Sequence, residues 1–257
     1  MSTEALHAAP AVAAQPSATR LSIGWGIGTI GASLLLNGFA IIAPFFLTTV
    51  LGAAATAAAG VLFLAKVWDI FSNPLMGALS DSTQTRWGRR RPYLIVGGLV
   101  AGGAYAGLFS AGITPVGDSL WLVGLLVVLV GTGYTIFNVP YMAMPAEMVD
   151  DYAARTRMFS YRVLFIAVGT LIGGSAGQKL AELAGGGPRG YAVMGVAIGL
   201  GIFAFMSAAA FGTAGARFTE RTAGRASFAT QVKSGLANKP FATLLGVKFM
   251  QLFGLFT

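Results

Sequence analysis

The sequence predicts an all-α integral membrane protein that contains a six-helix transmembrane bundle and the start of a seventh helix. Hydrophobic residues make up 55% of the 257-residue chain and charged residues only 10%, whereas a soluble domain carries about 25% charge. The apolar residues are also gathered into long windows. Each window approaches or exceeds the roughly 20 residues that an α-helix needs to cross a bilayer, so lipid is expected to surround most of this chain.

These windows define the predicted domain organisation. Residues 1–22 are rich in Ala, Pro, Ser and Thr, so we expect a disordered cytoplasmic tail and not a signal peptide. Residues 216–239 are the longest polar segment between windows and are expected to form a cytoplasmic linker. The start of helix seven, 240–257, has no flanking loop, which favours a truncated chain. The bundle itself, residues 23–215, is predicted from windows at roughly residues 23–50, 55–80, 92–113, 119–147, 159–184 and 190–215.

Basic residues are concentrated in alternate connections between the windows. Arg20 precedes the first window, the connection after the second runs from Arg86 to Arg91, and the connection after the fourth contains Arg155 and Arg157. Because Lys and Arg are enriched in cytoplasmic loops, we expect a cytoplasmic N-terminus and multi-pass insertion in the plasma (inner) membrane. The net charge of +8 follows from this topology and does not indicate binding of nucleic acid.

Several chemistries are excluded by the residue types that the chain lacks. It contains no Cys, and its single His, His7, lies in the predicted tail. Disulfides, thiolate metal sites and His-based relays are therefore not expected. We therefore expect no cofactor. Asp150 and Asp151 are adjacent and lack His or Gly-rich phosphate partners, so a membrane-embedded enzyme is not expected either.

The second window carries charged and polar residues deep inside an apolar stretch. Lys66, Asp69 and Asn73 follow i, i+3, i+7 spacing and so share one helix face, with Ser72 on its flank. Asp69 lies about 18 Å of helix rise before Asp81, near the middle of the bilayer. Charge at that depth costs roughly 3 kcal/mol or more and tends to mark function. One interpretation is a structural Lys–Asp ion pair, and the other is a cation or proton site built from carboxylate, amide and hydroxyl oxygens.

Further polar residues are expected at the same depth on two other helices. Asn138 precedes Asp150 by about 18 Å of rise, which matches the depth of Asp69, and Thr135 lies one turn away. Aromatic faces suit sugar rings, although isolated aromatic residues more often belong to a core. Additional candidates to line a cavity are Ser33 and Asn37 in the first window, together with Tyr134, Tyr141, Phe39 and Trp25.

Two residues near the predicted inner surface carry opposite charges. Glu147 ends the fourth window, and Arg162 is expected at the beginning of the fifth helix. We expect Glu147 to form an ion pair either with Arg162 or with the arginine loop after the second window. Such a pair would act as a cytoplasmic latch.

Two long motifs carry a family resemblance. The first reads KVWDIFSNPLMGALSD over residues 66–81 and continues as TRWGRRRP over residues 85–92. The second reads NVPYMAMPAE over residues 138–147 and is followed by DY, RTR and SYR, the last ending at Arg162. In this order and at these helix ends, the motifs resemble the glycoside–pentoside–hexuronide:cation symporter family of the major facilitator superfamily. The resemblance covers about residues 23–257, which would be the N-terminal six-helix bundle and part of helix seven of a twelve-helix family.

This resemblance implies alternating access, with a solute held between two six-helix bundles and driven by entry of Na+, Li+ or H+. The missing C-terminal bundle is then an expected partner. In the melibiose permease branch two helix-two carboxylates bind the cation: Asp69 matches the first and Asn73 replaces the second, while Thr135 matches a threonine ligand. The two galactoside-binding carboxylates of that branch fall at Ser33 and Asn138, which argues against melibiose and leaves another glycoside, a pentose, a hexuronide or a different solute.

The residues thus form three predicted sets. For the cation-coupling set, proton coupling, sodium coupling and uncoupled facilitation are all open alternatives. A further alternative is that the half-length chain is an inert or regulatory fragment. The cation-coupling set is Lys66, Asp69, Ser72, Asn73 and Thr135; the substrate-binding set is Ser33, Asn37, Tyr134, Asn138 and Arg162; the conformational loop motif is Gly77, Asp81, Gly88, Arg89 and Arg90.

Overall fold

The computed structural model describes residues 17–216, 243 and 247, and this part of the chain contains six helical segments long and apolar enough to cross a membrane. The prediction of an all-helical six-span bundle is confirmed. The predicted tail up to residue 16, nearly all of the linker 216–239 and nearly all of the seventh window 240–257 lie outside the described residues.

The first span is assembled from three helical pieces, α1 (Ala18–Gly26), α2 (Gly28–Phe45) and the π-helical turn η1 (Phe46–Val50). It begins at Ala18, earlier than the predicted residue 23, so the predicted tail is wrong over residues 18–22. The Ser17 side chain accepts a hydrogen bond from the Arg20 backbone N–H at 3.4 Å. That bond caps an exposed helix start, and a cap of this kind leaves no apolar signal in the sequence.

The fifth span also begins earlier than predicted, at Tyr152 and not near residue 159. Asp151 accepts a hydrogen bond from the Ala154 backbone N–H at 2.8 Å and caps the helix. Arg155 therefore lies in the first turn of the span and not in a loop. The remaining elements are α3 (Ala55–Ser82), α4 (Arg91–Ser110), η2 (Ala111–Ile113), η3 (Pro115–Asp118), α5 (Leu120–Met148), α6 (Tyr152–Leu171), η4 (Ile172–Ala176), α7 (Gly177–Leu183) and α8 (Gly187–Gly212).

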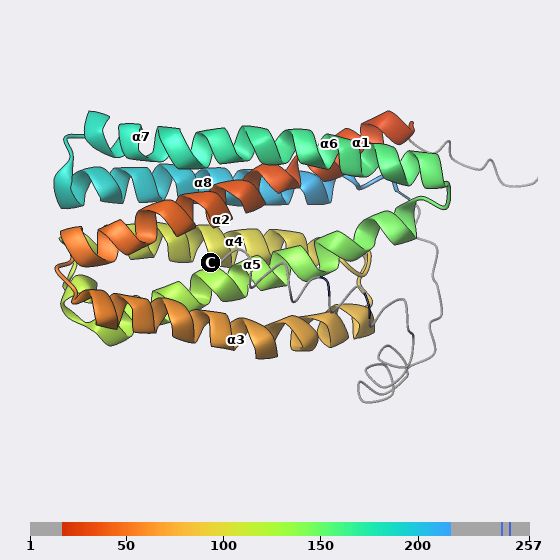
Figure 1. The fold of residues 1–257 in the computed structure, drawn as a ribbon. Helices are drawn as coiled ribbons and strands as arrows, with labels where there is room; N and C mark the ends of the chain where they lie inside the picture. The colour runs from red at the N-terminus through yellow and green to blue at the C-terminus, as the bar shows by residue number, and fades with distance from the viewer. Residues whose placement is uncertain (1–16, 217–242, 244–246, 248–257) are drawn as a thin grey trace, which may run out of the picture. The chain divides into compact units, whose positions relative to one another are not determined.

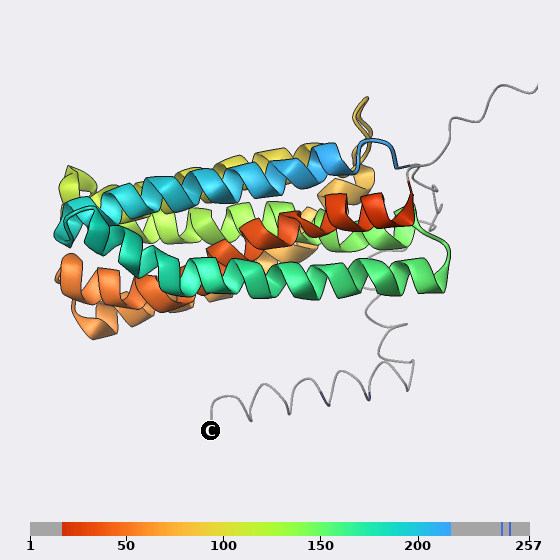
Figure 2. The same ribbon diagram turned by 90° about the horizontal axis from the view of Figure 1, so that it is seen from above.

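The helices pack with unequal closeness (Figures 1 and 2). Helix α4 makes its most extensive contacts with α8 and then with α5. A Cβ atom on Gly102 would lie 2.3 Å from the Gly199 carbonyl oxygen, so the α4 and α8 backbones touch where glycine leaves room. Small residues allow this close approach in lipid, where burial of apolar surface does not drive helix association. Helix α3, in contrast, packs chiefly on α5, and several of its large apolar side chains are exposed.

One end of the bundle carries Arg89, Arg90 and Arg91 and is called the basic end. Contacts made there connect several helices. Gly88 has a φ of 96°, a left-handed conformation that favours glycine, and its N–H donates to the Thr85 carbonyl at 3.0 Å. Arg91 donates to the carbonyls of Thr213 and Ala216, just past the end of α8. Arg91 thereby ties this end of α4 to the segment that follows α8.

Candidate functional site

A cavity of about 370 Å³ opens between three helices halfway along the bundle. Its only charged lining residues are Lys66 and Asp69, both on α3. Tyr134 on α5 supplies a hydroxyl group, and Phe39 on α2 supplies an aromatic face. The other lining residues are Leu35, Leu36, Ala40, Pro44, Leu62, Phe63, Ala65, Val127, Val130 and Gly131.

Asp69 occupies the centre of α3 and faces this cavity. It is the fifteenth of 28 residues in the helix, roughly 20 Å of rise from either end. The Lys66 Nζ lies 3.2 Å from Asp69 Oδ2, so the predicted ion pair is present. The two side chains differ in exposure, 74% for Lys66 and 24% for Asp69. The carboxylate is thus held near the cavity wall while the ammonium stands at its mouth.

Gly131 on α5 makes room for the other oxygen of the same carboxylate. A Cβ atom added at Gly131 would lie 3.2 Å from Asp69 Oδ1, closer than most Cβ contacts. Sequence reasoning missed Gly131 because glycines are frequent in these spans and nothing distinguishes this one from a packing glycine. The one sequence feature that could have indicated Gly131 is its position one helical turn before Thr135.

Helices α3 and α5 run parallel in a nearly constant register. The Trp68 Nε1–H donates to Thr132 Oγ1 at 2.9 Å. Further along, a Cβ on Gly77 would lie 3.9 Å from Val139 Cγ1. Together with the Asp69–Gly131 approach, these pairs fix an offset of 62 to 64 residues between neighbouring positions of the two helices.

This register places the other predicted cation-coupling residues just past Asp69. Ser72 and Asn73 fall level with Thr135, and both Ser72 and Thr135 are buried. The Asn73 Nδ2 donates to the Asp69 backbone carbonyl at 2.6 Å, which leaves the side-chain oxygen of Asn73 available. Four of the predicted cation-coupling residues therefore lie within about one helical turn of one another. Their role as ligands stays a prediction.

Arg162 lies deeper than predicted. Because α6 starts at Tyr152, Arg162 is about 15 Å of rise inside the span and not at the helix beginning. Its guanidinium interacts electrostatically with the hydroxyls of Tyr134 and Tyr141, and Tyr134 also interacts with Asp69. The Arg162 Nε is buried and has no hydrogen-bond partner among the described residues. A positively charged side chain of α6 thus lies within electrostatic range of the cavity residue Tyr134.

The helix-one residues Ser33 and Asn37 lie at the contact between α2 and α6. A Cβ on Gly169 would be only 2.6 Å from Ser33 Cβ, so these helices pack tightly there. The Asn37 Nδ2 donates to the Ser33 carbonyl at 3.1 Å and to Thr170 Oγ1 at 3.0 Å. Neither residue lines the 370 Å³ cavity. The contribution of Ser33 and Asn37 to solute binding stays a prediction. The contacts that they make in the structure are helix-packing contacts.

The aromatic residues divide into two groups. Phe39 and Tyr134 line the cavity. Trp25 and Tyr141 belong to the core, stacked at 4.6 Å between ring centroids, with the Trp25 Nε1–H donating to the Tyr141 carbonyl at 3.1 Å. Of the two alternatives for these aromatic residues, Trp25 and Tyr141 thus follow the core and not the cavity lining. Asn138 is half-buried and lies one turn beyond Tyr134 toward the basic end, just outside the cavity lining.

Glu147 forms its ion pair with the arginine loop and not with Arg162, and the role of this pair as a latch stays a prediction. Arg90 donates to both carboxylate oxygens of Glu147, at 2.6 and 2.9 Å, and Arg89 donates to Oε1 at 2.5 Å. Arg90 also donates to Asp81 Oδ1 at 3.1 Å. The side chains of Glu147 and Arg90 are only 11% and 7% exposed. The two motifs, far apart in the sequence, thus meet in one charged network.

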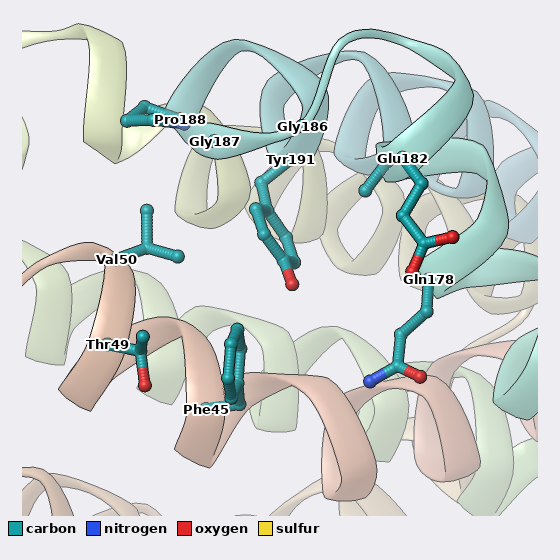
Figure 3. A pocket seen from close by; sticks show the side chains of 10 residues that line it. Phe45, Thr49, Val50, Gln178, Glu182, Gly186, Gly187, Pro188 and Tyr191 are labelled. Carbon is teal, nitrogen blue, oxygen red and sulfur yellow. The ribbon is translucent and has the colours of Figure 1, made fainter.

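A second cavity, of about 490 Å³, lies at the end of the bundle opposite the basic end (Figure 3). Tyr191 and Phe45 point into it from α8 and α2, and Gln178 and Glu182 approach from α7. Gln178 and Glu182 are exposed, so this cavity is lined by no buried charged side chain. Its other lining residues are Thr49, Val50, Ala181, Gly186, Gly187 and Pro188.

The described residues contain no group of three or more Asp, Glu or His side chains that could hold a metal ion. The prediction that the protein needs no cofactor is not tested by this observation. Fold and site together define a multi-pass membrane protein whose described residues place a carboxylate at mid-span and a buried charged network at one end.

Comparison with known proteins identifies the class more closely. Residues 24–257 match the family model described as MFS/sugar transport protein, and the chain belongs to this family. Its members are transporters and not enzymes, and the resemblance drawn from the two motifs is confirmed.

Individual relatives are distant. An uncharacterized symporter of Synechocystis is 31% identical over 58% of this chain and 29% of its own length. The putative glycoside/cation symporter YagG of Escherichia coli is 27% identical over 89% of this chain and 50% of its own. A glucuronide carrier protein homolog of Escherichia coli is 28% identical over 61% of this chain and 35% of its own. The chain thus spans half or less of the length of these relatives.

Proposed function

We propose that this protein is a secondary active transporter that carries a sugar-type solute together with Na+ or H+ by alternating access. The observation that carries the proposal is Asp69, a single carboxylate at mid-span that faces a cavity formed by three helices. A charged side chain at that depth is energetically costly, so it tends to mark a functional site. One relative is named a putative glycoside/cation symporter, which supports this proposal.

The solute is proposed to be a hexuronide or another acidic glycoside in preference to a neutral sugar. Arg162 approaches Tyr134 and Tyr141, and no ion pair of Arg162 occurs within residues 17–216. An unpaired guanidinium inside a bundle favours an anionic ligand, because it binds carboxylates through two parallel hydrogen bonds. One relative is named a glucuronide carrier homolog. We propose the plasma (inner) membrane as its location, with the basic end in the cytoplasm.

The proposal is tested with Asp69→Asn in proteoliposomes loaded to hold a Na+ or H+ gradient. Concentrative uptake of radiolabelled glucuronide should be lost, while exchange of the same solute without a gradient persists. Equal accumulation by both proteins would remove Asp69 from the coupling role. Because the chain spans half or less of its relatives, uptake is measured with the chain alone and with the chain joined to a second six-helix bundle of the family.

The solute class has its own test. Arg162→Gln should weaken binding of a glucuronide by about tenfold or more and leave a neutral methyl glucoside unchanged. Asn138→Ala should weaken binding of both solutes, because an amide contacts hydroxyl groups that they share. Calorimetry that gives equal losses for both solutes in Arg162→Gln would contradict an acidic solute.

Uncoupled facilitation is the second candidate function. The specific observation that favours it is the Lys66–Asp69 ion pair, which leaves the cavity without net charge. A facilitator would equilibrate solute across the membrane at the same rate with and without a cation gradient. Accumulation above the external concentration would exclude it.

A further inference from the structure

Lys66 belongs to the predicted cation-coupling set, yet an ammonium group has no lone pair with which to bind a cation. The 370 Å³ cavity contains one acidic and one basic side chain, and they contact each other at 3.2 Å. One carboxylate oxygen, Oδ2, is therefore already occupied by a cation that belongs to the protein. The other oxygen, Oδ1, faces the space left by Gly131.

The remaining groups around Asp69 do not compensate a second positive charge. Asn73 and Ser72 present neutral amide and hydroxyl groups, and their donors are directed at the Asp69 backbone carbonyl. Arg162 adds positive charge beyond Tyr134. A Na+ ion that entered while Lys66 held its place would stand beside two cations with a single carboxylate, and like charges at close range repel.

The geometry also allows the ammonium to leave. The Lys66 side chain is 74% exposed, contacts Asp69 through one bond, and carries a strongly hydrated charge on a flexible four-carbon stem. Asp69 is held from the other side, since it is one-quarter exposed and approached by α5 at Gly131. The carboxylate is thus packed against α5, whereas its partner is largely exposed.

We propose that Lys66 is a tethered competitor for the coupling cation: its ammonium occupies the Asp69 site at rest, and Na+ binds only by displacing it. This inference rests on the proposed function, since it assigns to Asp69 the role of cation ligand. Because Na+ displaces the ammonium, Asp69 is paired with one positive charge both at rest and with Na+ bound. It also sets a low Na+ affinity that removal of the Lys66 charge should raise.

The test is direct Na+ binding to the purified full chain in nanodiscs, with NaCl as the probe and choline chloride as the ionic-strength control. Lys66→Gln should bind Na+ at least about tenfold more tightly than the unaltered protein, because the competitor is gone. Lys66→Arg keeps the charge and should leave the affinity near its original value. Lys179→Gln, which removes an exposed positive charge on α7, controls for net charge and should also have no effect.

Two outcomes would overturn the inference. Equal or weaker Na+ binding by Lys66→Gln, with helical content unchanged by circular dichroism, excludes competition. A gain that persists in the double variant Lys66→Gln/Asp69→Asn places the bound Na+ elsewhere and also excludes it. The proposed function is tested by a different measurement. If glucuronide accumulation survives in Asp69→Asn, coupling at Asp69 is contradicted, and this result does not depend on the Na+ affinity of Lys66→Gln.

Discussion

Glu147 and Asp69 are both paired with basic side chains, and the two pairings have opposite designs. Glu147, at the basic end, is nearly buried and receives three hydrogen bonds from Arg89 and Arg90. Asp69, at the centre of α3, receives one contact from a largely exposed lysine. Planar guanidinium groups fix a carboxylate from several directions, whereas an ammonium is a mobile point charge.

The difference shows that the number and burial of the contacts decide what an ion pair does. The Glu147 network ties the loop after α3 to the end of α5 across the two sequence motifs. The Asp69 pair joins two residues on one helix and restrains no second helix. The first arrangement suits a latch that holds one conformation, and the second suits a site whose occupant changes.

The largest expected effect comes from breaking the buried network. Glu147→Gln leaves Arg90 buried at 7% exposure without its main partner, which should cost about 3 kcal/mol of stability. Thermal unfolding in detergent measures the loss as a lowered Tm. Glu182→Gln removes an exposed carboxylate on α7 and is the matched control. Equal, small shifts for the two variants would contradict the distinction between the two pairings.

The next effect tests how closely α5 approaches the central carboxylate. Gly131→Ala brings a Cβ to 3.2 Å from Asp69 Oδ1 and should weaken Na+ binding about tenfold, or about 1.4 kcal/mol. Gly103→Ala, where the added Cβ would meet no atom within 4 Å, is the control. Calorimetry in NaCl gives both affinities. Unaltered Na+ affinity in Gly131→Ala would show that a cation does not use the Oδ1 side.

A smaller effect is expected when a second carboxylate is added at the central site. Asn73→Asp places a negative charge one turn from Asp69 and should strengthen Na+ dependence by roughly 1 kcal/mol, about fivefold. The comparison of uptake in Na+ and choline media measures the change, and Asn73→Ala controls for loss of the amide. If cation preference does not move in Asn73→Asp, Asn73 lies outside the cation site.

The smallest effect is expected at the rim of the latch. Asp81 is 63% exposed and contacts Arg90 through a single bond of 3.1 Å. Exposed pairs contribute little, so Asp81→Asn should lower stability by less than about 1 kcal/mol. The same thermal unfolding assay applies. A loss as large as that of Glu147→Gln would mean that the loop motif and not the buried carboxylate holds this end together.

Much of the molecule could be predicted from local sequence. Six apolar windows gave six spans, because backbone polar groups in lipid must be satisfied within each helix. The Lys66–Asp69 pair followed from i, i+3 spacing on one helix. Helix starts at Ala18 and Tyr152 were missed, since a single side-chain cap can extend a helix through polar residues that hydropathy does not register.

The sequence by itself thus determined the fold class, the family motifs and the charged face of the second span, all of which depend on neighbours along one helix. Only the tertiary structure decided which partner Glu147 takes, that Gly131 clears space for Asp69, and that Trp25 and Tyr141 form core and not cavity. Those outcomes depend on the register between helices. Register is fixed by close packing of side chains far apart in the chain, which spacing along a single helix does not encode.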